Sequence, residues 1–204
     1  MNNEAVQKYC NLMAEVKLRT RVVYALMDGK LHVGFKATTI EVIYLQFRKM
    51  LELIAIGSLV ANKDVYSKAH ESFIKHKRAD YIIKDIERLN SNFYPQPIIQ
   101  KPSGVSGVKM EWLERPQDYL TKDDLIKLYG KCGIILHSEN PYGSQIDYGY
   151  YEGKMEYWGS RIMNLLNAHY IRLVNDPNLY LIQMGSKDEA PSHCAFAPTS
   201  KLKD

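Results

Sequence analysis

The sequence predicts a mainly α-helical fold: an up-and-down bundle of about five to six helices with a small C-terminal β-hairpin. Apolar residues recur at three- and four-residue steps over most of the chain, and one segment near residues 40–56 is apolar almost throughout. Alternation typical of strands is concentrated near the C-terminus. Because 46% of the 204 residues are hydrophobic, one sizeable core can be buried, so we expect a single domain over residues 1–204.

The first two helices are the clearest elements of the pattern. Apolar residues from Val6 to Met27 follow the helical period and predict a helix over residues 3–27, ended by Asp28 and the glycine after it. Thr38 and Glu41 have capping-box spacing and predict the start of a second helix, which continues to about residue 62. Since that helix is apolar on nearly every side, we expect it at the centre of the bundle.

The rest of the chain alternates between shorter helices and irregular segments. Helices are expected over residues 65–76 and 79–89, followed by a long loop over 91–118 that short strands at 97–100 and 109–113 could organise. Thr121 and Asp124 mark the start of another helix, which ends near His137, and a last long helix is expected over 151–174. Residues 177–200 form the predicted hairpin, an appendage that must pack on the bundle to be stable.

Composition indicates where the protein acts and which partners it can take. The formal net charge of +4 permits a polyanionic partner without requiring one. The three cysteines are far apart and form no CxxC pair, which is typical of a reducing compartment. Without a signal-peptide pattern or an apolar run of about 18 residues, we expect a cytoplasmic protein with no membrane segment. The 15 tyrosines favour half-buried seams and interfaces.

Candidate chemistry is concentrated in residues 129–141, YGKCGIILHSENP. Lys131 and His137 lie six positions apart at a helix end, and a six-residue step turns an ideal helix by about 240°. The two side chains would therefore share a site only if the helix end unwinds or a second subunit supplies one of them. We predict a site at the helix end or at a dimer seam.

This pattern resembles the HEPN family of helical bundles, whose ribonuclease members carry an Arg and, a few residues later, a His near the end of a late helix. The resemblance covers residues 1–175 as an architecture, with Lys131 and His137 at the motif positions. Here Lys replaces the family's Arg, and Cys132 replaces a residue that is often polar. The resemblance implies a metal-independent endoribonuclease of a defence or toxin system, acting on RNA as a homodimer without a cofactor.

The resemblance also implies roles for individual residues. His137 would transfer a proton during attack of the RNA 2′-hydroxyl on the adjacent phosphate, and Lys131 would stabilise charge on the phosphate oxygens. Ser138 and Asn140 could hydrogen-bond the substrate. Tyr142 could stack on a base, or belong to a core or interface instead. Arg48 is either half of a structural ion pair with Glu52 or, with Glu41 and Glu52, part of a cleft shared with His137.

Two interpretations from other functional classes remain open. The first is a non-catalytic interaction module with a degenerate motif, which binds a protein partner through the hairpin or through the tyrosine-rich segment at residues 142–157. The second is an enzyme with a small-molecule pocket along the Arg48 and Glu52 stripe. No metal is expected, because His70 and His76 are six residues apart and would point about 120° apart on a helix.

Overall fold

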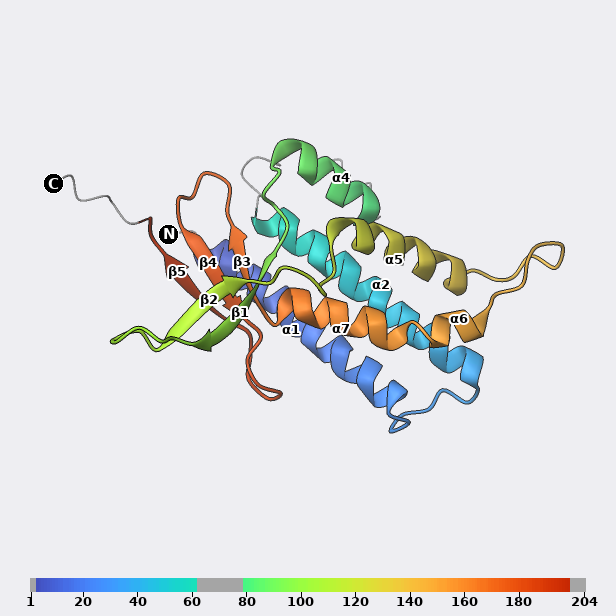
Figure 1. Cartoon of the computed structure of the whole chain (residues 1–204). Helices are drawn as coiled ribbons and strands as arrows, with labels where there is room; N and C mark the ends of the chain where they lie inside the picture. The colour runs from blue at the N-terminus through green and yellow to red at the C-terminus, as the bar shows by residue number, and fades with distance from the viewer. Residues whose placement is uncertain (1–2, 62–78, 199–204) are drawn as a thin grey trace.

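The structure is a computed structural model that describes residues 3–61 and 79–198, in which helices form one part of the molecule and a β-sheet the other (Figure 1). The helices are α1 (Asn3–Met27), α2 (Lys36–Ala61), α4 (Ala79–Leu89), α5 (Lys122–Leu136), α6 (Tyr148–Glu152) and α7 (Met155–Leu166). The strands are β1 (Gln96–Pro102), β2 (Met110–Glu114), β3 (Ala168–Arg172), β4 (Leu179–Gln183) and β5 (Ser192–Phe196). The helix expected over residues 65–76 lies outside the described residues.

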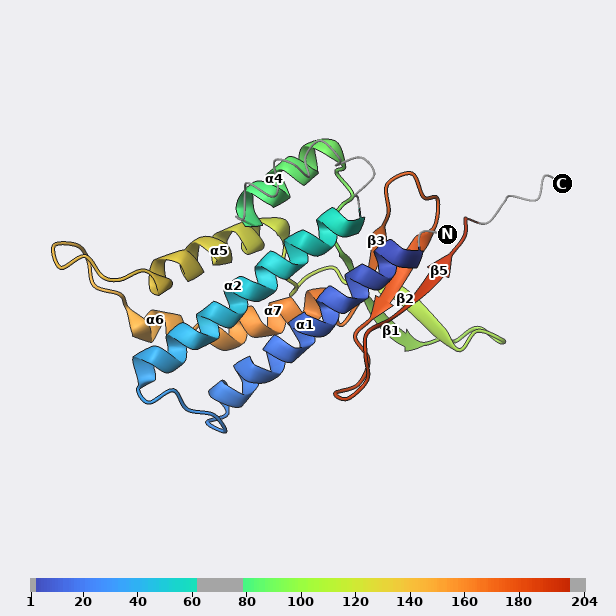
Figure 2. The ribbon, with the colours of Figure 1, turned by 180° about the vertical axis from the view of Figure 1, so that it is seen from behind.

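The two longest helices, α1 and α2, lie side by side along the molecule (Figures 1 and 2). The prediction for α1 is confirmed, and α2 is central because it contacts α1, α4, α5 and α6. The predicted cap of α2 is wrong, since the helix begins at Lys36 and Thr38 lies inside it. The Thr38 hydroxyl instead accepts a hydrogen bond from the Phe35 N–H at 3.3 Å. The Phe35 N–H also donates to the Val33 carbonyl at 2.8 Å, so Thr38 only shares a donor that precedes the helix.

A glycine in α2 allows α1 to approach closely. A Cβ atom on Gly57 would lie 2.9 Å from Cε2 and 3.2 Å from Cδ2 of the Tyr9 ring. Tyr9 is only 1% exposed, and its hydroxyl lies 2.8 Å from Nε2 of His169 in β3. The ring is therefore held from its far end and cannot swing away from α2.

We expect Gly57→Ala to lower the free energy of unfolding by about 1 to 3 kcal/mol, because overpacking outweighs the better helix propensity of alanine. Urea denaturation measures the change. Gly130 in α5 is the matched control, since nothing lies within 4 Å of the position of its Cβ. Gly130→Ala should leave stability unchanged or raise it. A Gly57→Ala protein as stable as the wild type would contradict the tight contact between α1 and α2.

The strands form one five-stranded antiparallel sheet with the order β2-β1-β3-β4-β5. The predicted fold class, a helical bundle with a small C-terminal hairpin, is therefore wrong. Residues 177–200 do contain a hairpin, β4 and β5, but it continues a larger sheet through β3. Residues 91–118 were expected as a long loop that short strands at 97–100 and 109–113 could organise, and these strands are present as β1 and β2, which pair from Ile98–Glu114 to Pro102–Met110.

The error arose mainly in the last predicted helix, 151–174. In the structure this segment is divided among α6, α7 and β3, with Asn167 as the C-cap of α7 directly before the strand. Ala168, His169 and Ile171 are all buried, so β3 is covered on both faces. A strand of this kind shows no alternation of polar and apolar residues, and its pattern cannot be distinguished from a buried helix.

The two faces of the sheet have different partners. His169 and Ile171 of β3 face the helices, and Ile171 belongs to the main core. Ala168 faces the other way, into a small second core with Ile98 of β1 and Leu181 of β4. The sheet therefore contributes to the main core on one side and closes its own small core on the other.

Candidate functional site

Helix α5 carries the residues that the sequence predicted as a site. It begins with a capping box, in which the Thr121 hydroxyl accepts from the Asp124 N–H at 3.1 Å and the Asp124 carboxylate accepts from the Thr121 N–H at 3.4 Å. The predicted start of this helix is confirmed. At the other end His137 is the C-cap, with an extended backbone at φ −93° and ψ 146°. The chain thus leaves the helix at His137.

The imidazole of His137 is exposed at this end of α5. The backbone N–H of His137 donates to the Ile134 carbonyl at 3.3 Å, which closes the last turn. Among the described residues, no side chain or carbonyl forms a hydrogen bond or ion pair with the ring. The ring is therefore open to a ligand from outside the chain.

Lys131 lies about one and a half turns before the end of α5 and is partly buried. Its Nζ atom is 4.9 Å from the centroid of the Tyr150 ring in α6, a cation–π contact. The neighbouring Tyr151 hydroxyl donates to the Lys131 carbonyl at 3.4 Å. The amine of Lys131 is thus held beside the ring of Tyr150, a residue that is 39% exposed.

Lys131 and His137 are not joined by any contact within the described part of the chain. Lys131 is in the regular helix and reaches α6, whereas His137 follows the helix in extended conformation. One chain therefore presents the two groups at the same end of α5 without bringing them together. A common site formed by both, with or without a second subunit, stays a prediction.

The other predicted substrate-binding residues of this region lie in the connection from α5 to α6, which projects from the end of the molecule opposite the sheet (Figures 1 and 2). Ser138, Asn140 and Tyr142 are all exposed, and Tyr142 is exposed by 97%. The Asn140 side-chain oxygen accepts from the Tyr142 N–H at 3.0 Å, and its carbonyl accepts from the Gly143 N–H at 2.8 Å. The connection therefore presents Tyr142 on an organised turn.

Arg48 is bound within the protein, between α2 and α5. It donates to the Tyr129 hydroxyl at 2.8 Å, stacks its guanidinium 4.4 Å from the centroid of that ring, and pairs with Glu52 at 3.3 Å. Glu41 is occupied elsewhere, because it accepts from the Tyr148 hydroxyl at 2.5 Å. These contacts favour the structural interpretation of the Arg48–Glu52 pair, and they do not place Arg48 against His137.

The cysteine of the motif segment is not a nucleophile. Cys132 is fully buried under α2, and burial raises the pKa of its thiol to about 12, although nearby Arg48 opposes the shift. The thiol is therefore protonated at neutral pH and acts as a small apolar side chain.

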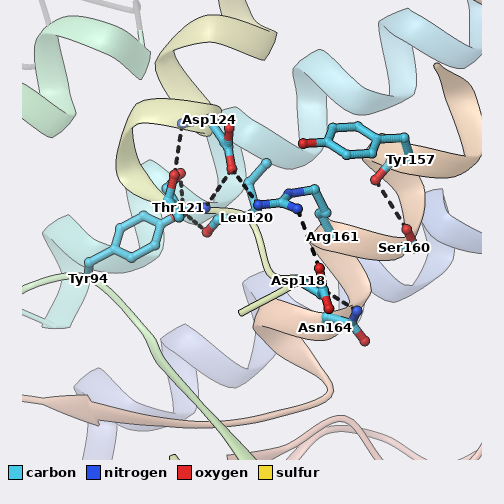
Figure 3. Close-up of polar contacts among 9 residues, drawn as sticks. All are labelled: Tyr94, Asp118, Leu120, Thr121, Asp124, Tyr157, Ser160, Arg161 and Asn164. Carbon is cyan, nitrogen blue, oxygen red and sulfur yellow. Dashed lines mark hydrogen bonds and ion pairs between the residues drawn. The ribbon is translucent and has the colours of Figure 1, made fainter. Parts of the chain in front are cut away.

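Sequence reasoning missed a second group of cations beside aromatic rings, on α7. Tyr157 has the Lys154 ammonium 5.3 Å from its ring centroid and the Arg161 guanidinium 5.0 Å from it. The spacing by three and four residues along a helix was the available signal. Figure 3 shows that Arg161 also reaches Asp124 at 3.1 Å, so this arginine joins α7 to the start of α5.

Comparison with protein-family models, curated proteins and solved structures finds no match to this chain. The resemblance to the HEPN family therefore rests on the residue pattern alone.

Two further observations concern the parts of the chain that are described. No helix there is both long and apolar enough to cross a membrane. Within the same ranges, no group of three or more His, Cys, Asp or Glu side chains is arranged to hold a metal ion. His70 and His76 lie outside the described residues.

Proposed function

We propose that this protein binds single-stranded RNA at the end of α5 and, as a homodimer, cleaves it without a metal ion, as HEPN-like nucleases of defence or toxin systems do. The observation that carries the proposal is the exposed imidazole of His137, which has no partner among the described residues. The nearby amine of Lys131 and the exposed rings of Tyr142 and Tyr150 add charge and stacking surfaces for a single strand.

The reaction needs a group that moves protons and a group that stabilises negative charge. The RNA 2′-oxygen attacks the adjacent phosphorus while the bond from phosphorus to the 5′-oxygen breaks, which leaves a 2′,3′-cyclic phosphate and a 5′-hydroxyl. One imidazole accepts the proton of the 2′-hydroxyl, and a protonated imidazole donates one to the departing 5′-oxygen. The ammonium of Lys131 stabilises the charge on the non-bridging phosphate oxygens.

A homodimer supplies both proton-transfer groups at once. One chain has a single histidine at the end of α5, and its Lys131 is turned towards α6. Two copies that meet at this end would place two imidazoles and two amines along one strand of RNA. Cleavage should therefore depend on protein concentration when that concentration falls below the dissociation constant of the dimer.

The test is incubation of the purified chain with end-labelled single-stranded RNA in EDTA. We expect cleavage products with 2′,3′-cyclic phosphate ends. His137→Ala should reduce the rate by at least about 100-fold, the usual lower range for loss of a general acid–base group. Lys131→Ala should reduce it as well, whereas Lys131→Arg should retain or increase activity because a guanidinium binds phosphate with two parallel donors.

His32→Ala is the matched control, because His32 is also an exposed histidine outside regular structure. This variant should cleave at the wild-type rate, and all variants should keep the wild-type circular-dichroism spectrum. RNA that stays intact at every protein concentration, or a His137→Ala protein that cleaves normally, would refute the proposed nuclease.

A second candidate function is a non-catalytic interaction module, and one observation favours it. Lys131 is engaged by Tyr150, while Tyr142 is 97% exposed on an organised turn. A protein partner would bind this tyrosine-rich end or the C-terminal hairpin and leave RNA intact. The cleavage assay separates the two candidates. The nuclease cleaves RNA and loses this activity in His137→Ala, whereas the interaction module leaves RNA intact.

We further propose a cytoplasmic location. Cys10, Cys132 and Cys194 are all free thiols, as expected for a protein of a reducing compartment.

A further inference from the structure

A cavity of about 240 Å³ lies at the opposite end of α5 from His137. Its walls come from residues 91–97, which lead into β1, and residues 114–119, which lead from β2 towards α5. The side chains that matter here are Ser91, Tyr94, Gln96, Glu114, Arg115 and Tyr119. This volume is slightly below the lower end of the range for small-molecule pockets, about 300 Å³. The cavity therefore suits a small organic molecule rather than a polymer.

Arg115 in the cavity wall is a charged side chain without a counter-charge. Its Nε atom is buried and has no hydrogen-bond partner, and it forms no ion pair with any described residue. Arg161 gives the contrast: its Nε is also unpaired, but its terminal nitrogens reach Asp124 at 3.1 Å and Asp118 at 4.0 Å. A partly buried charge that is not paired with an opposite charge is unfavourable. An anionic ligand would therefore stabilise Arg115.

The cavity is formed before any ligand enters. The backbone N–H of Arg115 donates to the Pro97 carbonyl at 3.0 Å, and this hydrogen bond joins the two walls of the cavity. The Tyr94 hydroxyl donates to the Leu120 carbonyl at 2.9 Å, and Figure 3 shows this ring anchored beside the start of α5. Pro95 and Pro97 restrict the backbone of the rim. A ligand would therefore bind without ordering the surrounding chain.

We propose that this cavity binds a small molecule that carries an oxyanion group, either a carboxylate or a phosphate, through the guanidinium of Arg115. A planar guanidinium binds both oxyanions through parallel N–H donors. Glu114 accepts from hydroxyl or amino groups of the same ligand, and the rings of Tyr94 and Tyr119 cover its carbon skeleton.

This site is separate from the proposed RNA site. The 15 residues of α5 span about 22 Å, with His137 after one end and the cavity beside the other. A failure of RNA cleavage would therefore not count against ligand binding in the cavity. A failure of ligand binding would likewise not count against the nuclease.

The experiment is thermal denaturation of the full chain with orthophosphate, adenosine 5′-monophosphate or L-glutamate, each compared with sodium chloride at equal ionic strength. We expect at least one probe to raise the melting temperature in a saturable manner. A response to orthophosphate identifies the phosphate group itself, a response to the nucleotide alone requires its ring as well, and a response to glutamate identifies a carboxylate. Titration calorimetry should then give one site per chain.

Arg115→Met provides the decisive comparison. It should abolish the ligand response while leaving the melting temperature without ligand equal to the wild type or higher, because it removes an unpaired charge and keeps the aliphatic stem. Arg115→Lys should weaken the response and keep the fold. Arg172→Met, at an exposed arginine in β3, and His137→Ala should both respond as the wild type does.

Three results would overturn the proposal. The first is that no probe stabilises the wild type beyond the sodium chloride control. The second is that Arg115→Met retains the full response. The third is that both Arg115 variants melt well below the wild type without ligand, which would assign Arg115 a structural partner instead.

Discussion

As the pH falls from 7 to 5, the protein is expected to lose about 2 kcal/mol of unfolding free energy through His169 alone. This histidine is fully buried between α1 and the sheet, and burial lowers its pKa from 6.5 to about 4. The unfolded chain therefore takes up a proton at a higher pH than the folded chain does. The contribution to stability is complete above the unfolded pKa and is lost progressively as pH falls towards 4, where the loss reaches about 3 kcal/mol.

The two hydrogen-bond partners of His169 fix the tautomer of the neutral ring. Nδ1 lies 2.9 Å from the Leu166 carbonyl, which can only accept, so Nδ1 carries the hydrogen. Nε2 then accepts from the Tyr9 hydroxyl at 2.8 Å. Protonation would place a charge in a site that has no carboxylate contact to the ring among the described residues.

Urea unfolding at pH 7, 6 and 5 tests this expectation, in a range above most carboxylate titrations. The wild type should become less stable relative to His169→Gln, whose amide is polar but does not titrate. Tyr9→Phe should cost about 1 to 3 kcal/mol at pH 7, because it leaves Nε2 without a donor, yet it should keep the pH dependence. Parallel pH profiles for the wild type and His169→Gln would show that His169 is not the group responsible.

Asp124→Asn is expected to lower the free energy of unfolding by about 3 kcal/mol, because it removes the main counter-charge of Arg161. The two side chains are each 19% exposed and lie 3.1 Å apart, whereas Asp118 is 4.0 Å away and 72% exposed (Figure 3). Asparagine can still accept from the Thr121 N–H in the capping box. The loss therefore reports the charge pair that joins α5 to α7, rather than the helix cap.

A double-mutant cycle isolates the pair. Arg161→Met keeps the aliphatic stem and removes the cation. The double variant Asp124→Asn with Arg161→Met should therefore lose at least about 1 kcal/mol less unfolding free energy than the sum of the losses in the two single variants. Asp124→Ala should lower the free energy of unfolding by about 0.5 to 1 kcal/mol more than Asp124→Asn, because it also removes the side chain that accepts from the Thr121 N–H, one half of the capping box. Additive single and double changes would mean that the ion pair contributes nothing to the packing of α7 on α5.

For the candidate site, the sequence located the right segment but not its contacts. His137 was expected near a helix end, and it is the C-cap of α5. The partner of Lys131, the Tyr150 ring, could not be predicted because it comes from another helix whose orientation depends on packing. Arg48 was a candidate for substrate binding, but the neighbouring α5 provides Tyr129 as its partner. The Arg115 cavity had no local signal, since its walls come from two separate segments.

The sequence by itself determined the helices whose apolar period and caps are local: α1, most of α2, and α5 with its Thr121 capping box. Only the tertiary structure decided the sheet, because β3 is covered on both faces and its strand partners are distant in the chain. Helical hydrogen bonds form between residues four apart, so a short segment contains their signal. Strand pairing and side-chain contacts between elements depend on residues far away, which no local pattern encodes.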